Sequence, residues 1–175
     1  MPTITLATGQ LTDFKGDSLI CGSVTDLTAT TNKNAKELLE KAGKGLEAEL
    51  LAIGYCALGN AVITKGHDIK VKHIIFVPIK DSFDPTYLMN FTLLHQAIRS
   101  ALTLADIYKV KTLAIPMLNP GFKKCSIVDK IMAKFTDNNR LKPISDDEVL
   151  SIIMSVAKDF EKSSISEITV YKFVR

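Results

Sequence analysis

The fold of this chain is decided by residues 59–77, which read GNAVITKGHDIKVKHIIFV. The pattern predicts a strand over residues 61–64, a turn at Gly66-His67-Asp68 and a second strand over residues 73–77. The second strand carries a continuous apolar run, which is typical of a strand covered on both faces. Strands of this kind lie inside sheets that have helices on both sides, so the stretch predicts an α/β protein.

The rest of the chain continues this alternation of strands and helices. Further strands are predicted over residues 3–7, 17–24, 111–116 and 168–174, and helices over residues 35–42 and 46–53. Another helix is expected to begin at Asp84, as its capping residue, and Pro85, in its first turn. A final helix follows a Ser145-x-x-Glu148 capping box. The order of elements predicts a three-layer α/β/α sandwich around a central mixed β-sheet.

The length and composition indicate one folded domain. The chain has 175 residues, of which 46% are hydrophobic, and this excludes an intrinsically disordered protein. We expect a single domain over residues 1–175. Residues 124–143, which combine basic residues with an Asn-rich turn signal, are predicted to be an insertion.

Charge and cysteine usage exclude several classes of protein. The net charge of +3 is too small to indicate nucleic-acid binding, and no apolar run is long enough for a membrane helix. Three widely spaced cysteines do not form a disulfide framework, and the sequence predicts no metal site and no cofactor. Residues 1–9 lack the features of a signal peptide, so we expect a cytoplasmic protein.

Candidate binding segments follow the ends of the predicted strands. In α/β sheets, ligands bind outside the carboxyl ends of the strands, where loops lead into helices. Residues 21–24, 28–34 and 116–122 occupy such places in this chain. Gly22 and Gly121 allow the backbone to approach a ligand closely, and N–H groups in such turns can bind phosphate.

Several segments together resemble the macro domain family. Cys56 and residues 59–75 are similar to the family's Cys-x-x-Gly-x-Ala-x-Ile-Thr segment and the strand that follows it. Gly9-Gln10-Leu11-Thr12 resembles the family's Gly-Asp-Ile-Thr, and residues 17–20 resemble its Asp-Ala-Ile-Val. The resemblance extends in order over nearly the whole chain. It implies binding of ADP-ribose or a related nucleotide. Some members of the family also hydrolyse ADP-ribosyl groups from proteins or deacetylate O-acetyl-ADP-ribose, and others only bind.

The resemblance also implies which residues would contact the ligand. They fall into an adenine side and a group of phosphate and ribose loops. The adenine side comprises Gln10 and Leu11; the loops comprise Cys21, Gly22, Ser23, Val24, Asn32, Lys33, Asn119, Gly121, Phe122 and Lys123.

At several of these positions the chain departs from the family pattern. Gln10 replaces the Asp that reads adenine, and Val24 replaces an Asn that contacts the distal ribose and supports hydrolysis. Residues 30–33 replace a glycine-rich loop, and Ala35 stands where some members carry a catalytic acid. We therefore predict a protein that binds a phosphate-bearing small molecule, or an ADP-ribosylated protein, without catalysis and with no catalytic residue.

Two alternatives remain open at this point. One is an ADP-ribosyl hydrolase with a rebuilt site, for which Cys21, Asp17 and Asn119 are the candidates. The other is a degenerate macro fold that serves as a protein interaction module. Its expected surface is the apolar stripe of Ile127, Ile131, Met132 and Phe135. For Cys21 and Cys56, burial in the core is the simpler interpretation.

Overall fold

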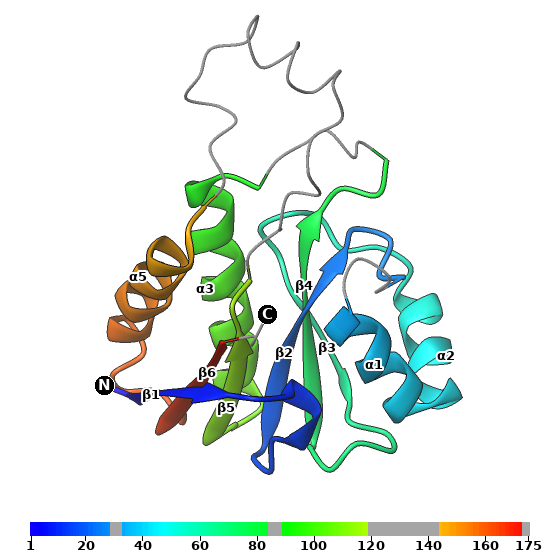
Figure 1. Ribbon diagram of the computed structural model, residues 1–175, viewed down its shortest axis with the longest axis horizontal. Helices are drawn as coiled ribbons and strands as arrows, with labels where there is room; N and C mark the ends of the chain where they lie inside the picture. Colours follow the sequence, from blue (N-terminus) through cyan, green and yellow to red (C-terminus); the bar gives the residue numbers. More distant parts are fainter. Residues whose placement is uncertain (29–32, 84–88, 119–143, 173–175) are drawn as a thin grey trace, which may run out of the picture.

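A six-stranded mixed sheet forms the centre of the molecule (Figure 1). The computed structural model describes residues 1–28, 33–83, 89–118 and 144–172. The strands are β1 (Thr3–Thr8), β2 (Ser18–Val24), β3 (Val62–Lys65), β4 (His73–Lys80), β5 (Thr112–Pro116) and β6 (Glu167–Lys172). Their order across the sheet is β1-β6-β5-β2-β4-β3. All neighbours are parallel except β3 and β4, which form the predicted hairpin.

Helices cover both faces of this sheet. Helices α1 (Lys33–Ala42) and α2 (Lys44–Ile53) lie on one face, and α3 (Phe91–Ile107) and α5 (Asp146–Lys158) lie on the other (Figure 1). A short 3₁₀ helix, η1 (Leu11–Asp13), connects β1 to β2. The predicted three-layer α/β/α sandwich with a mixed sheet is therefore confirmed.

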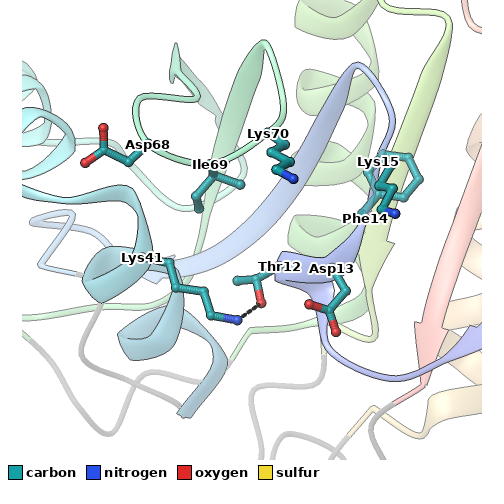
Figure 2. A pocket seen from close by; sticks show the side chains of 8 residues that line it. All are labelled: Thr12, Asp13, Phe14, Lys15, Lys41, Asp68, Ile69 and Lys70. Carbon is teal, nitrogen blue, oxygen red and sulfur yellow. Dashed lines mark hydrogen bonds between the residues drawn. The ribbon is translucent and has the colours of Figure 1, made fainter.

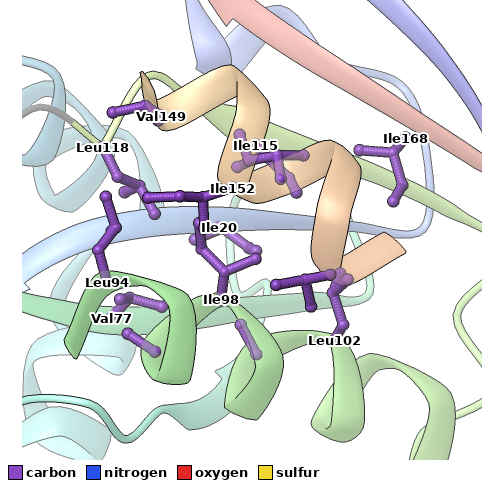
Figure 3. Close-up of a cluster of buried hydrophobic side chains, with 14 of the residues drawn as sticks. Ile20, Val77, Leu94, Ile98, Leu102, Ile115, Leu118, Val149, Ile152 and Ile168 are labelled. Carbon is purple, nitrogen blue, oxygen red and sulfur yellow. The ribbon is translucent and has the colours of Figure 1, made fainter. Parts of the chain in front are cut away.

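Side chains along the central strands point alternately to the two faces of the sheet, and this divides the hydrophobic core into two clusters. Ile20, Val77 and Ile115 face α3 and α5, where they pack with Ile98 and Ile152 (Figure 3). The intervening residues face α1 and α2, and among them are Leu19, Cys21 and Phe76. All seven residues of β2 are buried, as expected for a strand between two layers of helices.

The observed helix starts can be compared with the predicted capping residues. The Ser145 capping box is confirmed: the Ser145 hydroxyl accepts from the Glu148 N–H, and a Glu148 carboxylate oxygen accepts from the Ser145 N–H at 2.7 Å. The predicted start of α3 is wrong. Asn90 is extended (φ −94°, ψ 170°), and its side chain accepts from the Leu93 N–H at 2.9 Å, so the helix begins at Phe91. Residues 84–88 and the predicted insertion at 124–143 lie outside the described residues.

The amino ends of three central strands meet at one carboxylate, that of Asp17. Its Oδ1 accepts from Lys72 Nζ at 2.7 Å, and its Oδ2 accepts from the N–H groups of Lys111 and Thr112 at 2.9 and 3.2 Å. Its carbonyl oxygen also accepts from the N–H groups of Lys72 and His73. Asp17 thus joins the start of β2 to the residues that open β4 and β5.

These partners stabilise the ionised form of Asp17. The hydrogen bond from Lys72 and those from the two backbone N–H groups outweigh partial burial, and they lower the pKa of Asp17 from 3.8 to about 2. Because the folded pKa is depressed, the stabilisation is complete above the unfolded pKa and is lost as the pH falls through the folded one.

We predict that Asp17→Asn lowers the free energy of unfolding by about 1–3 kcal/mol at neutral pH, because a charge-assisted acceptor is removed while its donors remain. The difference from the parent protein should shrink as the pH falls from about 4 to about 2, where Asp17 itself becomes protonated. Urea unfolding at several pH values measures both effects. Lys72→Met, which removes one of the donors, should cost less; equal stability of the parent and Asp17→Asn across the range would contradict this role.

Candidate functional site

The predicted ligand loops leave the carboxyl edge of the sheet. Because β2, β4 and β5 are parallel, their carboxyl ends meet at one edge, and residues 21–24 are the last four of β2. The structure therefore places the predicted segment Cys21-Gly22-Ser23-Val24 at this edge, although all four residues are buried.

Gly22 lies against side chains of the neighbouring strands. A Cβ atom built at Gly22 would lie 3.1 Å from Ile79 Cδ1 and 3.4 Å from Leu118 Cδ2. Ile79 belongs to β4, and Leu118 follows β5. The absence of a side chain at Gly22 thus lets the carboxyl ends of three strands pack closely on the face that carries α3 and α5.

Ser23 carries an unusual hydroxyl group. Its side chain is fully buried, yet among the described residues its Oγ has no hydrogen-bond partner. Ser18, at the other end of β2, is equally buried, but its Oγ donates to the His73 carbonyl oxygen at 2.9 Å. An unpaired buried hydroxyl costs free energy, so Ser23 is the polar group at this edge that still lacks a partner.

Both described cysteines lie in the core beneath α1 and α2. Burial raises the pKa of the Cys21 thiol to about 12 and that of the Cys56 thiol to about 11. A thiolate is the nucleophilic form of cysteine, so at neutral pH neither group is activated for attack on a substrate.

A network of side chains fixes the loop that follows β2. The Thr25 and Ser82 hydroxyls lie 2.7 Å apart, and the Asp26 N–H donates to Ser82 Oγ at 3.1 Å. The Cys56 N–H donates to the Thr25 carbonyl oxygen at 2.8 Å. Sequence reasoning missed this network, although hydroxyl and carboxylate residues directly after two adjacent parallel strands were a usable signal.

The predicted adenine side is also held in place. Leu11 is buried in the same hydrophobic cluster as Cys21, on the face of the sheet that carries α1 and α2. Gln10 Oε1 accepts from Lys41 Nζ at 3.4 Å. Lys41 donates as well to Thr12 Oγ1 and pairs with Glu37, each at 2.7 Å, which ties the turn after β1 to α1.

A hollow lies beside this turn, towards the amino edge of the sheet (Figure 2). It encloses about 560 Å³ between η1, the last turn of α1 and the turn that joins β3 to β4. Its lining residues are Thr12, Asp13, Phe14, Lys15, Lys41, Asp68, Ile69 and Lys70. Three lysine and two aspartate side chains are among them, so the charge of the hollow is mixed. None of the predicted site residues lines this hollow.

Apart from Lys33, the other predicted site residues belong to the segments on either side of the described ranges. Asn32, Asn119, Gly121, Phe122 and Lys123 lie outside the described residues, and Lys33 is described only as the first residue of α1. In the part of the chain that is described, no group of three His, Cys, Asp or Glu side chains could hold a metal ion. None of the described helices is both long and apolar enough to cross a membrane.

The family model described as "Macro domain" matches residues 28–131. The histone macroH2A1.1 of Capsaspora owczarzaki is 26% identical over 173 residues, which cover 95% of this chain and 41% of that protein. The chain therefore spans less than half the length of this curated relative.

Solved structures share the fold. The Oceanobacillus iheyensis macrodomain with ADP superposes with a TM-score of 0.74 at 17% identity, over 99% of this chain and 85% of that one. The Trypanosoma brucei macrodomain in complex with ADP-ribose gives a TM-score of 0.72 at 16% identity, over 96% and 62% of the respective chains. At these identities the likeness shows the fold alone.

Burial predicts the reactivity of the thiols. In a Cys125→Ser variant, we expect the two remaining cysteines to stay unreactive towards a disulfide reagent at neutral pH, because both are buried and their pKa values are raised. In concentrated guanidinium chloride both should react. Rapid modification of either thiol in the folded protein would contradict the burial described above.

Proposed function

Because the chain belongs to the macro domain family, we propose that it binds ADP-ribose or a related phosphate-bearing nucleotide at the carboxyl edge of its sheet. Macrodomains of the same fold have been solved with ADP and with ADP-ribose. The same site would accept the ADP-ribosyl group of a modified protein, since the modification presents the same nucleotide.

The Ser23 hydroxyl is the observation that carries this proposal. A fully buried hydroxyl without a partner is destabilising, and such groups persist where another molecule supplies the missing hydrogen bond. Ser23 lies at the carboxyl end of β2, where α/β sheets bind ligands. We infer that a ribose hydroxyl or a phosphate oxygen pairs with it, and that Cys21, Gly22 and Val24 shape the adjoining wall.

The remaining contacts follow the family pattern and belong to the same proposal. Asn32 and Lys33 would meet the phosphates on one side. Asn119, Gly121, Phe122 and Lys123 would form the second loop.

Gln10 and Leu11 would meet the base. Because Lys41 holds Gln10 Oε1, the contact at Gln10 would be made mainly by its side-chain amide N–H groups.

We propose binding without hydrolysis, and two candidate catalytic groups support this choice by their positions. The Cys21 thiol is buried with a raised pKa, and the Asp17 carboxylate lies at the amino edge, bonded to Lys72, Lys111 and Thr112. A general base must lie within hydrogen-bond reach of the proton it removes, and Asp17 is at the opposite end of β2 from the proposed site.

Calorimetric titration with ADP-ribose tests the binding, and two serines of β2 provide a matched pair of variants. Ser23→Ala should weaken binding by about tenfold, because one hydrogen bond to the ligand is lost, while the free energy of unfolding stays equal or rises. Ser18→Ala should lower the free energy of unfolding by about 1 kcal/mol and leave affinity unchanged, because its hydroxyl is already bonded to His73.

Opposite results would overturn the assignment. If Ser23→Ala destabilises the protein and binds ADP-ribose as tightly as the parent, the hydroxyl has a structural role. If the parent protein gives neither heat nor a thermal shift with millimolar ADP-ribose, ADP-ribose is not its ligand.

Hydrolysis is tested separately by incubating the protein with a mono-ADP-ribosylated protein and measuring the release of free ADP-ribose. We expect no release above that of a buffer control. Release that is lost in Cys21→Ala or Asp17→Asn, with the fold intact, would show that the rebuilt hydrolase site exists.

A further inference from the structure

The first strand of the chain forms an open edge of the sheet. In the described part of the molecule, β1 pairs with β6 alone and is the last strand on its side. The N–H of Thr3 donates to the Ser166 carbonyl oxygen, so Thr3 faces the neighbouring strand. Backbone groups alternate in direction along a strand, and Thr5 and Ala7 therefore face β6 as well. Ile4, Leu6 and Thr8 direct their N–H and C=O groups to the open side.

The sequence of β1 itself has none of the residues that usually protect an edge strand. Residues 3–8 read TITLAT, with no charge, no proline and no glycine. Leu6 is 56% exposed on the same face of the strand as Ile4. The opposite edge of the sheet is better protected, because β3 has only four residues, ends in Lys65 and is contacted by α2 and α3.

We propose that two copies of this chain associate through antiparallel pairing of their β1 strands. The strand suits pairing with a second copy of itself, because it is uncharged and rich in β-branched residues. A second β1 also offers the same set of outward N–H and C=O groups. Pairing would extend the sheet across both molecules about a two-fold axis perpendicular to it.

The backbone pattern determines the register of this pair. In an antiparallel ladder, residues opposite one another point to the same face and bonded pairs exchange two hydrogen bonds. Placing Leu6 opposite Leu6 of the second copy also places Ile4 opposite Thr8, so every outward-facing residue of β1 is paired. The alternative centred on Thr5 would place Thr8 opposite Pro2, which has no N–H to donate.

The same register would cover the exposed side chain of Leu6. Across the two-fold axis, the two Leu6 side chains would lie side by side on the face that carries α3 and α5. One pair of short strands buries less area than a permanent interface, so the dimer is expected to be weak and to form in the micromolar range or above.

Sedimentation equilibrium on the full chain, from about 10 μM to about 1 mM, tests the proposal. Leu6→Pro removes an outward N–H without breaking the ladder to β6, and Leu6→Lys places two like charges together at the axis. Each should weaken dimerisation by about tenfold or more, because the lost interaction occurs on both sides of the axis. Thermal unfolding verifies that both variants remain folded.

Leu51→Lys is the matched control, because Leu51 is an equally apolar and 79% exposed residue on α2, away from β1. It should dimerise like the parent protein. Three results would each overturn the proposal: a parent protein that stays monomeric over the whole range, a dimer that persists in both Leu6 variants, or a dimer that is lost in Leu51→Lys.

Discussion

The carboxylate of Asp17 is the constraint on which the arrangement of the central strands depends. Parallel strands have no tight hairpin to set their register, because each must be reached through a crossover. Here one side chain accepts from the residues that precede β4 and open β5, while its own residue directly precedes β2. The three strands therefore start level with one another. Because they start level, their carboxyl ends also meet at one edge, and the loops that follow them converge.

The two ends of β2 have opposite polar properties as a result. At the amino end, Ser18 and Asp17 are hydrogen-bonded to the start of β4 and to the residue that precedes it. At the carboxyl end, the Thr25 and Ser82 network fixes the backbone that leaves the sheet, but the Ser23 hydroxyl has no partner among the described residues. A buried hydroxyl without a partner is destabilising, and in our proposal the ligand supplies the missing hydrogen bond at this point. Neither buried cysteine offers a comparable group, because both thiols lie among apolar side chains.

The sequence was most informative where a local pattern has one physical solution. The apolar run of Ile74 to Val77 requires cover on both faces, and it correctly predicted a central strand of an α/β sandwich. The start of α3 could not be predicted, because Asp84 and Asn90 are both good capping residues and spacing does not distinguish them. The site was harder still. Ser18 and Ser23 lie on one strand and are both buried, and they differ only in whether the folded protein places a hydrogen-bond acceptor within reach of the hydroxyl.

The proposed ligand site and the proposed dimer contact would use different directions of the same sheet. Strand pairing at β1 extends the sheet within its plane, whereas the ligand loops leave from the ends of the strands, so the two need not compete. They approach each other only after Thr8, where Gly9, with φ +135°, turns the chain towards Gln10. A second copy bonded to Thr8 would restrict this turn and, through it, the Gln10 side chain that Lys41 holds. Any coupling between the dimer and the base of the ligand would therefore pass through this turn, and by linkage the ligand would change dimer affinity by the same factor.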